Sequence, residues 1–292
     1  MKLNGRREST HVDDRRRGGS GKKVAGGGIG AIILAVAIAY FTQGKEGAFR
    51  ALTDGVQQQI ALNGNVSTEG RKFTQEEDSL AKFSKQILAS TEDVWTQIFQ
   101  QMGKEYNYPE MVLYTGSVQT SCGNGSAAMG PFYCSGDQCV YLDLSFFSSM
   151  QEELGASGEF ANAYVIAHEV GHHIQDELGI LGRAHQQMAN MSQEEANKIS
   201  VRLELQADFF AGVWGYYEDK TFDSVSDKEI AEAIKCAHQI GDNYLQEQAR
   251  GYAVPESFTH GTSEQRMKWF KLGLTTGDIN RGDTFSVPEN RL

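Results

Sequence analysis

One stretch, His168-Glu169-Val170-Gly171-His172, constrains this chain more than any other. It is an H-E-x-x-H motif set between apolar side chains, and Gly179 stands where a helix would end, so we predict a helix over residues 158–178. Residues four apart on a helix share one face, so His168 and His172 can present their imidazole nitrogens to one metal ion. Glu169 projects beside that ion, where it can take a proton from a water. The alternative is an accidental histidine pair on a surface helix.

The charge of the chain is divided between a basic start and an acidic remainder. The net charge of the 292 residues is −11, yet residues 1–23 hold eight Lys and Arg against three acids. An acidic body argues against a nucleic-acid-binding surface, and the basic start has a better explanation in the segment that follows it. Apolar residues make up 40% of the chain, which is enough for a hydrophobic core.

Residues 24–41 form a run of 18 residues without a charge, close to the shortest length that crosses a bilayer. With the basic cluster on its N-terminal side, the positive-inside tendency predicts that residues 1–23 stay in the cytoplasm. The bulk of the chain would then lie in the extracytoplasmic space, periplasmic or extracellular. The alternative is a signal peptide cleaved near Ala37-Ile38-Ala39. We favour a retained transmembrane anchor because the apolar run continues through Phe41.

The rest of the chain is predicted to be a polar tether followed by one domain. Residues 42–73 are rich in Gly, Gln, Asn and Ser, which is typical of a linker, and residues 74–292 form the domain. Capping patterns predict helix starts at Thr74, Ser90, Ser192 and Ser226. Strands are predicted at residues 111–115 and in a hairpin of 132–133 with 140–142, and a short helix at 146–154. Because strands precede the histidine helix and helices follow it, the fold class is α+β, predominantly helical with a small sheet.

A catalytic zinc ion takes three protein ligands and keeps one position open, so the histidine pair needs a third partner. Asp176 is eight residues from His168, about 12 Å along a helix, which is too far for bonds of about 2 Å to one ion. His173 points about 100° away from His172 and faces elsewhere. The extended motif with a glycine and a third histidine also fails, because the chain has glutamine and leucine at those two positions.

The third ligand is therefore predicted to come from another helix. Glu204 and Asp208 lie one turn apart in an otherwise apolar helical run, and buried carboxylates need a partner that offsets their desolvation. We predict that Glu204 binds the metal and that Asp208 accepts the N–H of a liganding imidazole. The alternative is that both acids are solvated and paired with Arg202.

Together these motifs resemble the neutral zinc metallopeptidase family of bacterial single-pass membrane proteins. The ligand plan is similar to that of the gluzincins, in which a glutamate from a following helix joins two histidines. The matching stretches are residues 5–9, 130–134, 141–147, 164–175, 204–214 and 256–266. The resemblance implies a zincin-like fold, a Zn²⁺ cofactor held by His168, His172 and Glu204, and metallopeptidase activity with Glu169 as the base.

The cysteines are Cys122, Cys134, Cys139 and Cys236. In an exported domain an even number suggests two disulfides, and four cysteines allow three connectivities. Members of the family often carry two further cysteines, at the positions where this chain has Phe209 and Gly282. Their joint absence is expected if the two are partners, so the resemblance implies Cys122–Cys134 and Cys139–Cys236 as the pairs.

Residues 257–266 contain a histidine and an arginine six residues apart, His260 and Arg266. They resemble an element of membrane-associated zinc proteases in which the histidine helps to stabilise the tetrahedral oxyanion and the arginine organises the site. Such a donor steadies the negative charge that develops opposite the metal. The alternative is that Thr262 or Ser263 caps a helix and Arg266 forms a surface pair. The residues leave both interpretations open.

The leading hypothesis is a membrane-anchored zinc metallopeptidase that hydrolyses peptide or protein substrates with a zinc-activated water and Glu169 as general base. The predicted strand at residues 140–142 would offer an edge with which an extended substrate pairs. The alternative from another class is a non-catalytic, zinc-stabilised scaffold or binding domain at the membrane surface. An intact Glu169 argues against it, because a purely structural site has no need of a base.

Overall fold

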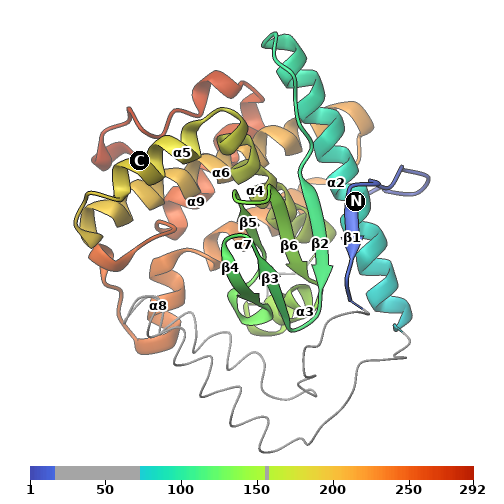
Figure 1. The fold of residues 1–292 in the computed structure, drawn as a ribbon, viewed down its shortest axis with the longest axis horizontal. Helices are drawn as coiled ribbons and strands as arrows, with labels where there is room; N and C mark the ends of the chain where they lie inside the picture. Colours follow the sequence, from blue (N-terminus) through green and yellow to red (C-terminus); the bar gives the residue numbers. More distant parts are fainter. Residues whose placement is uncertain (17–72, 155–157) are drawn as a thin grey trace, which may run out of the picture. The chain divides into compact units, whose positions relative to one another are not determined.

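The computed structural model describes residues 1–16, 73–154 and 158–292, which divide into two compact units (Figure 1). A helical unit holds residues 1–10, 83–109 and 154–292, and a sheet-containing unit holds the described parts of 11–82 and 110–153. The predicted anchor, residues 24–41, lies outside the described residues, as does the predicted tether apart from Phe73. Within the described ranges, every helix is too short or too polar to cross a bilayer.

The sheet-containing unit has a four-stranded sheet in the order β1-β2-β6-β5. The strands and helices of this unit are β1 (Val12–Asp14), β2 (Glu110–Tyr114), β3 (Ser117–Thr120), β4 (Gly123–Ser126), η1 (Ala127–Met129), β5 (Phe132–Cys134), β6 (Cys139–Asp143) and α3 (Ser145–Leu154). β5 and β6 form the predicted antiparallel hairpin, and β2 is the predicted strand at 111–115. β6, however, lies between β2 and β5. The predicted edge at residues 140–142 is therefore wrong, because both sides of that strand are already paired.

The first strand was not predicted, because it is short and largely charged. β1 pairs in parallel with β2, with Val12 opposite Met111, and Figure 1 shows it beside β2. Its side chains at Asp13 and Asp14 are exposed. The strand therefore rests on backbone pairing, which leaves no alternating apolar pattern in the sequence.

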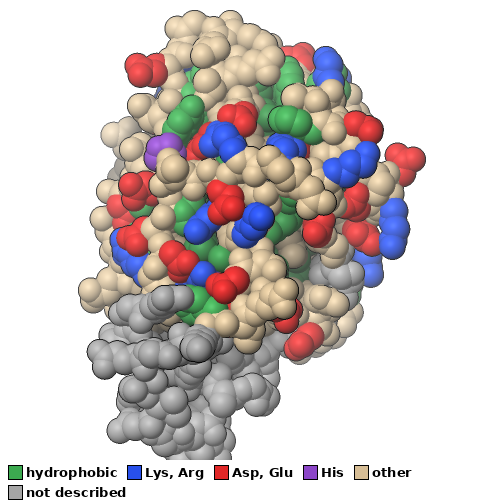
Figure 2. Space-filling view, turned by 90° about the vertical axis from the view of Figure 1, so that its right-hand side faces the viewer, with side chains coloured by type: hydrophobic (Ala, Val, Ile, Leu, Met, Phe, Trp, Pro, Cys, Tyr) green, Lys and Arg blue, Asp and Glu red, His purple; other side chains and the backbone are tan. Residues whose placement is uncertain are grey.

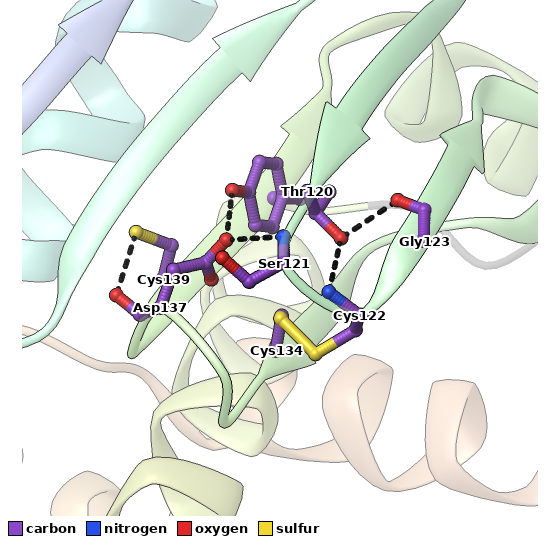
Figure 3. Close-up of a disulfide and its surroundings, with 8 residues drawn as sticks. Thr120, Ser121, Cys122, Gly123, Cys134, Asp137 and Cys139 are labelled. Atoms are coloured by element: carbon purple, nitrogen blue, oxygen red, sulfur yellow. Dashed lines mark hydrogen bonds between the residues drawn. A yellow bond between two sulfur atoms is a disulfide. The ribbon is translucent and has the colours of Figure 1, made fainter.

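One disulfide, Cys122–Cys134, is present and confirms the first predicted pair (Figure 3). The second predicted pair is wrong, because Cys139 and Cys236 are both thiols. Cys139 lies opposite Cys134 in the β5–β6 register and its sulfur donates to the carbonyl of Asp137 at 3.2 Å. Cys236 is buried on a helix of the other unit. The pairing was implied only by the family resemblance, and the two thiols lie buried in separate units.

The helical unit is assembled from helices, of which α6 and α7 begin at predicted caps. The bounds are α2 (Gln75–Gln101, its first residues in the other unit), α4 (Glu159–Glu177), α5 (Ile180–Met188), α6 (Gln193–Phe222), α7 (Asp227–Gln239), α8 (Asp242–Arg250), η2 (Pro255–Ser257), α9 (Ser263–Thr276), η3 (Ile279–Arg281) and η4 (Glu289–Arg291). Ser192 and Ser226 each form a complete capping box at the start of α6 and α7. Thr74 caps α2 in the same way, exchanging hydrogen bonds with Glu77.

The predicted second start at Ser90 is wrong, because α2 is continuous from Gln75 to Gln101. The Ser90 hydroxyl accepts from the indole N–H of Trp214 at 2.9 Å and donates to Glu218, so it serves contacts with α6 instead of a cap. Thr91 donates to the carbonyl of Leu88 within the helix at 2.7 Å. A cap-like sequence in mid-helix is thus compatible with helix when tertiary partners use the hydroxyls.

α6 is the central helix of this unit and packs against both α4 and α9. At Gly171, a Cβ atom would lie 2.8 Å from the carbonyl oxygen of Ala207, so the glycine inside the histidine motif lets α4 and α6 approach closely. Gly212 and Gly273 allow the same close approach between α6 and α9, since a Cβ on Gly273 would lie 2.1 Å from the Phe209 carbonyl. This close crossing brings the carboxylates of α6 within reach of the histidines of α4.

Candidate metal centre

Three side chains from α4 and α6 converge at one point. The Nε2 atom of His168 lies 3.1 Å from Oε2 of Glu204, and Nε2 of His172 lies 3.4 Å from Oε1 of the same carboxylate. The three ligand atoms all lie within 4.8 Å of one another. Helical spacing presents both imidazoles on one face, and the α4–α6 crossing supplies the carboxylate, as predicted.

The spacing of these atoms suits a tetrahedral metal ion. Bonds of about 2.1 Å at tetrahedral angles place neighbouring ligand atoms about 3.4 Å apart. The distances from the two histidines to Glu204, 3.1 and 3.4 Å, are close to this value and end on different oxygens of the carboxylate. Two imidazole nitrogens and one carboxylate oxygen are also the donor set of many catalytic zinc sites, which keep a fourth position open. His168, His172 and Glu204 therefore fit a zinc ion.

Each imidazole is oriented by a partner at its other nitrogen. Nδ1 of His168 lies 2.8 Å from Oδ1 of Asp208, as predicted, and Nδ1 of His172 lies 2.9 Å from Oε1 of Gln175. The Gln175 amide nitrogen donates to the carbonyl of Leu203 at 2.7 Å, so its oxygen faces the histidine. Both partners favour the tautomer with Nδ1–H, which leaves Nε2 as the metal-binding atom. Sequence analysis missed Gln175, although its position three residues after His172 places it on the same face.

A buried ion pair supports the first histidine. Arg266 donates to both carboxylate oxygens of Asp208, at 2.8 and 2.9 Å, and the Tyr164 hydroxyl donates to Asp208 at 2.5 Å. Asp208 is 0% and Arg266 3% exposed. The surface pair considered for Arg266 is therefore wrong, whereas Thr262 does cap α9. Burial raises the pKa of Asp208, but Arg266 and His168 outweigh it and lower that pKa to about 2.

The acids of the site hold protons on its histidines when no metal is bound. Burial lowers the pKa of His168, but the charge and hydrogen bond of Asp208 and the hydrogen bond of Glu204 outweigh it, so the pKa rises to about 10. His172 follows the same pattern: burial lowers its pKa, while Glu204 and more weakly Glu169 raise it, and the net direction is upward. Burial raises the pKa of Glu204, and the neighbouring histidines bring it well below its usual range.

Zinc binding should therefore release a proton from His168, because only the neutral imidazole binds a metal. Between pH 7 and pH 10 we expect the apparent Kd for zinc to fall about tenfold per pH unit and to level off above that pKa. The measurement is competition with a chelator of known affinity over this range. As a control, Asp208→Asn removes the main group that raises this pKa and should flatten the dependence near pH 7–9. A zinc affinity independent of pH in the unmodified chain would contradict the prediction.

Glu169, the candidate base, occupies the position after His168 on α4 and is 8% exposed. Its charge contributes to raising the pKa of His172, as described above. The rejected ligands point elsewhere: His173 is fully buried with its Nε2 2.7 Å from the carbonyl of Asn107. Arg202 donates to the carbonyls of Thr284 and Val287, so the alternative pairing with the acids of α6 is wrong.

His260 stands on the loop before α9 and is held by Asp242, the first residue of α8. One carboxylate oxygen of Asp242 accepts from the backbone N–H groups of Thr259, His260 and Gly261, at 2.7, 2.7 and 3.1 Å. The other lies 3.2 Å from Nδ1 of His260. Burial lowers the pKa of His260, but the charges of Glu204 and Asp242 outweigh it and raise that pKa. The field of Glu204 thus reaches His260. Asp242 is 0% exposed. It was not predicted, because no local sequence pattern distinguishes an acid at a helix start that pairs with a histidine.

Replacing Asp242 by Asn tests whether the orientation of His260 matters. An amide oxygen can still accept from the backbone of residues 259–261, but the amide nitrogen cannot accept a proton from Nδ1 of His260. We expect kcat/KM for peptide hydrolysis to fall about 10–100-fold, the range found when the partner of a site histidine is removed. Zinc content and Tm should change little. An unaltered kcat with the same fold and metal content would argue against a role for this pair.

Comparison with known proteins agrees with these features. The model of the family described as "Putative neutral zinc metallopeptidase" matches residues 1–285. The uncharacterized protein YpfJ of Escherichia coli is 44% identical over 291 residues, which cover 98% of this chain and 99% of that protein. An uncharacterized protein of Mycobacterium tuberculosis is 44% identical over 194 residues, 63% of this chain and 64% of its own length. No solved structure matches the chain.

Proposed function

We propose that this chain, which belongs to the putative neutral zinc metallopeptidase family, is a zinc-dependent endopeptidase that cleaves peptide or protein substrates. The observation that carries the proposal is the convergence of His168, His172 and Glu204 within 4.8 Å, with Glu169 on the same helix. Family membership supports the same chemistry, since its description names both zinc and peptidase activity.

Each residue of the site has a separate role in hydrolysis. Zinc, when bound by the two histidines and Glu204, supplies Lewis-acid chemistry that makes a water acidic near neutral pH. Glu169 accepts a proton from the attacking water and returns it to the leaving amine. His260 donates a hydrogen bond to the oxygen on which negative charge develops, and Asp242 keeps its ring in place. Asp208 and Arg266 hold the ring of His168 in its liganding orientation.

The proposal includes attachment to a membrane and an extracytoplasmic site. Attachment to a membrane is supported by the charge-free run at residues 24–41. The Cys122–Cys134 disulfide supports an oxidising compartment, because disulfides rarely persist in a reducing cytoplasm.

Zinc stoichiometry combined with a peptide-library cleavage assay tests the function. We expect about one zinc per chain and cleavage within peptides, lost on chelation and restored by adding zinc back. The scaffold alternative predicts the same zinc content, a lower Tm after chelation, and no cleavage of any library member. The two functions are thus separated by cleavage and not by metal binding.

A further inference from the structure

The first ten residues are packed into the unit that carries the metal centre. The backbone N–H of Ser9 donates to the carbonyl of Lys85 at 3.0 Å. The side-chain amide of Gln86 donates to the carbonyls of Leu3 and Arg6, at 3.0 and 3.2 Å. Figure 1 shows this start of the chain alongside α2. Residues 1–10 therefore contribute backbone as well as side chains to one helical unit.

Arg6 forms a buried ion pair within this unit. Its guanidinium donates to both oxygens of Glu218, at 2.9 and 3.0 Å, and lies 3.5 Å from the ring centroid of Phe222. Glu218 is fully buried and also accepts from Ser90 and Ser224. A buried carboxylate that loses its cation is strongly destabilising. The buried carboxylate of Glu218 on α6 thus requires a cation beside it, and Arg6 provides that cation.

The next residue, Arg7, pairs with a second buried acid, Glu92. Arg7 contacts Glu92 at 2.8 Å and Asp93 at 2.6 Å, and it donates to the carbonyl of Ala89 at 2.9 Å. Glu92 is 1% exposed and also accepts from the Ser9 hydroxyl. On the face drawn in Figure 2, basic and acidic side chains lie interspersed, without a separate basic field. Arg6 and Arg7 therefore complement acids of the unit and are not part of a free cationic tail.

These contacts restrict the path of the chain relative to a membrane. Glu218 lies on the same helix as Glu204, 14 residues further on, which is about 21 Å along the axis. The hydrocarbon core of a bilayer is about 30 Å thick. A bilayer between residues 1–10 and the metal centre would put Arg6 and Glu218 on opposite sides and leave a buried carboxylate without its cation.

We propose that residues 1–10 and the metal centre occupy the same side of the membrane, in one folded unit. This arrangement differs from the topology expected from the positive-inside tendency, in which a single crossing separates the N-terminus from the domain. The proposal is independent of peptidase activity, because it rests on Arg6, Arg7 and their acidic partners.

Single-cysteine reporters in the full-length chain test the proposal directly. Glu8 and Lys271 are both exposed, and the thiols of Cys139 and Cys236 are buried, so the unmodified chain serves as the blank. Glu8→Cys and Lys271→Cys are exposed separately to a membrane-impermeant maleimide in sealed vesicles of inside-out and right-side-out orientation. We expect the two positions to label in the same preparations. Labelling of the two in opposite preparations would overturn the proposal.

A double-mutant cycle tests the packing itself. Arg6→Met should raise the unfolding equilibrium constant at least tenfold and lower Tm, whereas Arg6→Met combined with Glu218→Gln should recover part of the loss. Arg15→Met is the matched control, because Arg15 is 48% exposed and pairs at 2.7 Å with Asp13 of its own segment. If Arg6→Met changes Tm no more than Arg15→Met does, residues 1–10 do not belong to the folded unit.

Discussion

Replacing Glu169 by Gln is expected to lower kcat/KM for peptide hydrolysis by about 10²–10⁴-fold, the contribution typical of a positioned general base. The amide matches the carboxylate in size but cannot accept the proton of the attacking water. His168, His172 and Glu204 are untouched, so the zinc content should stay near one per chain. The measurements are steady-state hydrolysis of a library-derived peptide and metal analysis of the same sample.

Two variants distinguish loss of the base from other effects. Asp176→Asn makes the same chemical change on the same helix, at a carboxylate that geometry excludes from the site, and should leave hydrolysis unchanged. Glu204→Gln should reduce hydrolysis through loss of zinc, with activity partly recovered at high zinc concentration. Peptide hydrolysis at the normal rate in zinc-loaded Glu169→Gln would remove Glu169 from the mechanism.

The convergence of the candidate metal ligands could be predicted because helical geometry acts locally. His168 and His172 share a face by spacing alone, and the same geometry excluded Asp176 and His173. Glu204 and Asp208 could be selected because acids in an apolar helix need a partner. The three capping boxes predicted at Thr74, Ser192 and Ser226 are likewise local, since each forms within four residues.

What could not be predicted depends on contacts between distant segments. Asp242 and Gln175 act through the residues they orient, and neither stands in a motif. Ser90 lost its expected capping role because α6 supplies partners for its hydroxyl. The predicted Cys139–Cys236 pair is wrong because the family resemblance that implied it carries no information about the distance between the two sulfurs.

Phe209 and Gly282 stand at the two positions where the family resemblance implies a further pair of cysteines. The ring of Phe209 packs against Gly282, where a Cβ atom would lie 2.4 Å from Cδ1 of that ring. The two positions are therefore neighbours in this chain, as expected if the cysteines that often stand there are partners. The absence of a side chain at Gly282 leaves room for the Phe209 ring.

Replacing Arg266 by Met should have the largest effect on stability, lowering the free energy of unfolding by about 3–5 kcal/mol, as found when a buried ion pair loses one partner. Asp208 would lose two charge-assisted hydrogen bonds in a place that water does not reach. Its lowered pKa contributes stability that is fully present above the ordinary value near 3.9 and is lost as pH falls through about 2. Without Arg266 that pKa rises, so the variant should lose stability at higher pH than the unmodified chain. Denaturant unfolding at several pH values measures both effects.

The double variant Arg266→Met with Asp208→Asn separates the cost of an unpaired charge from the cost of lost packing. The neutral amide still accepts from Nδ1 of His168, so much of the stability lost in Arg266→Met should return. Arg183→Met, at an exposed position of α5, is the control and should change the free energy of unfolding by less than about 0.5 kcal/mol. Zinc affinity should recover with stability, because the imidazole of His168 regains a neutral partner that holds its orientation. If the double variant is no more stable than Arg266→Met alone, Arg266 acts through packing and not by offsetting the charge of Asp208.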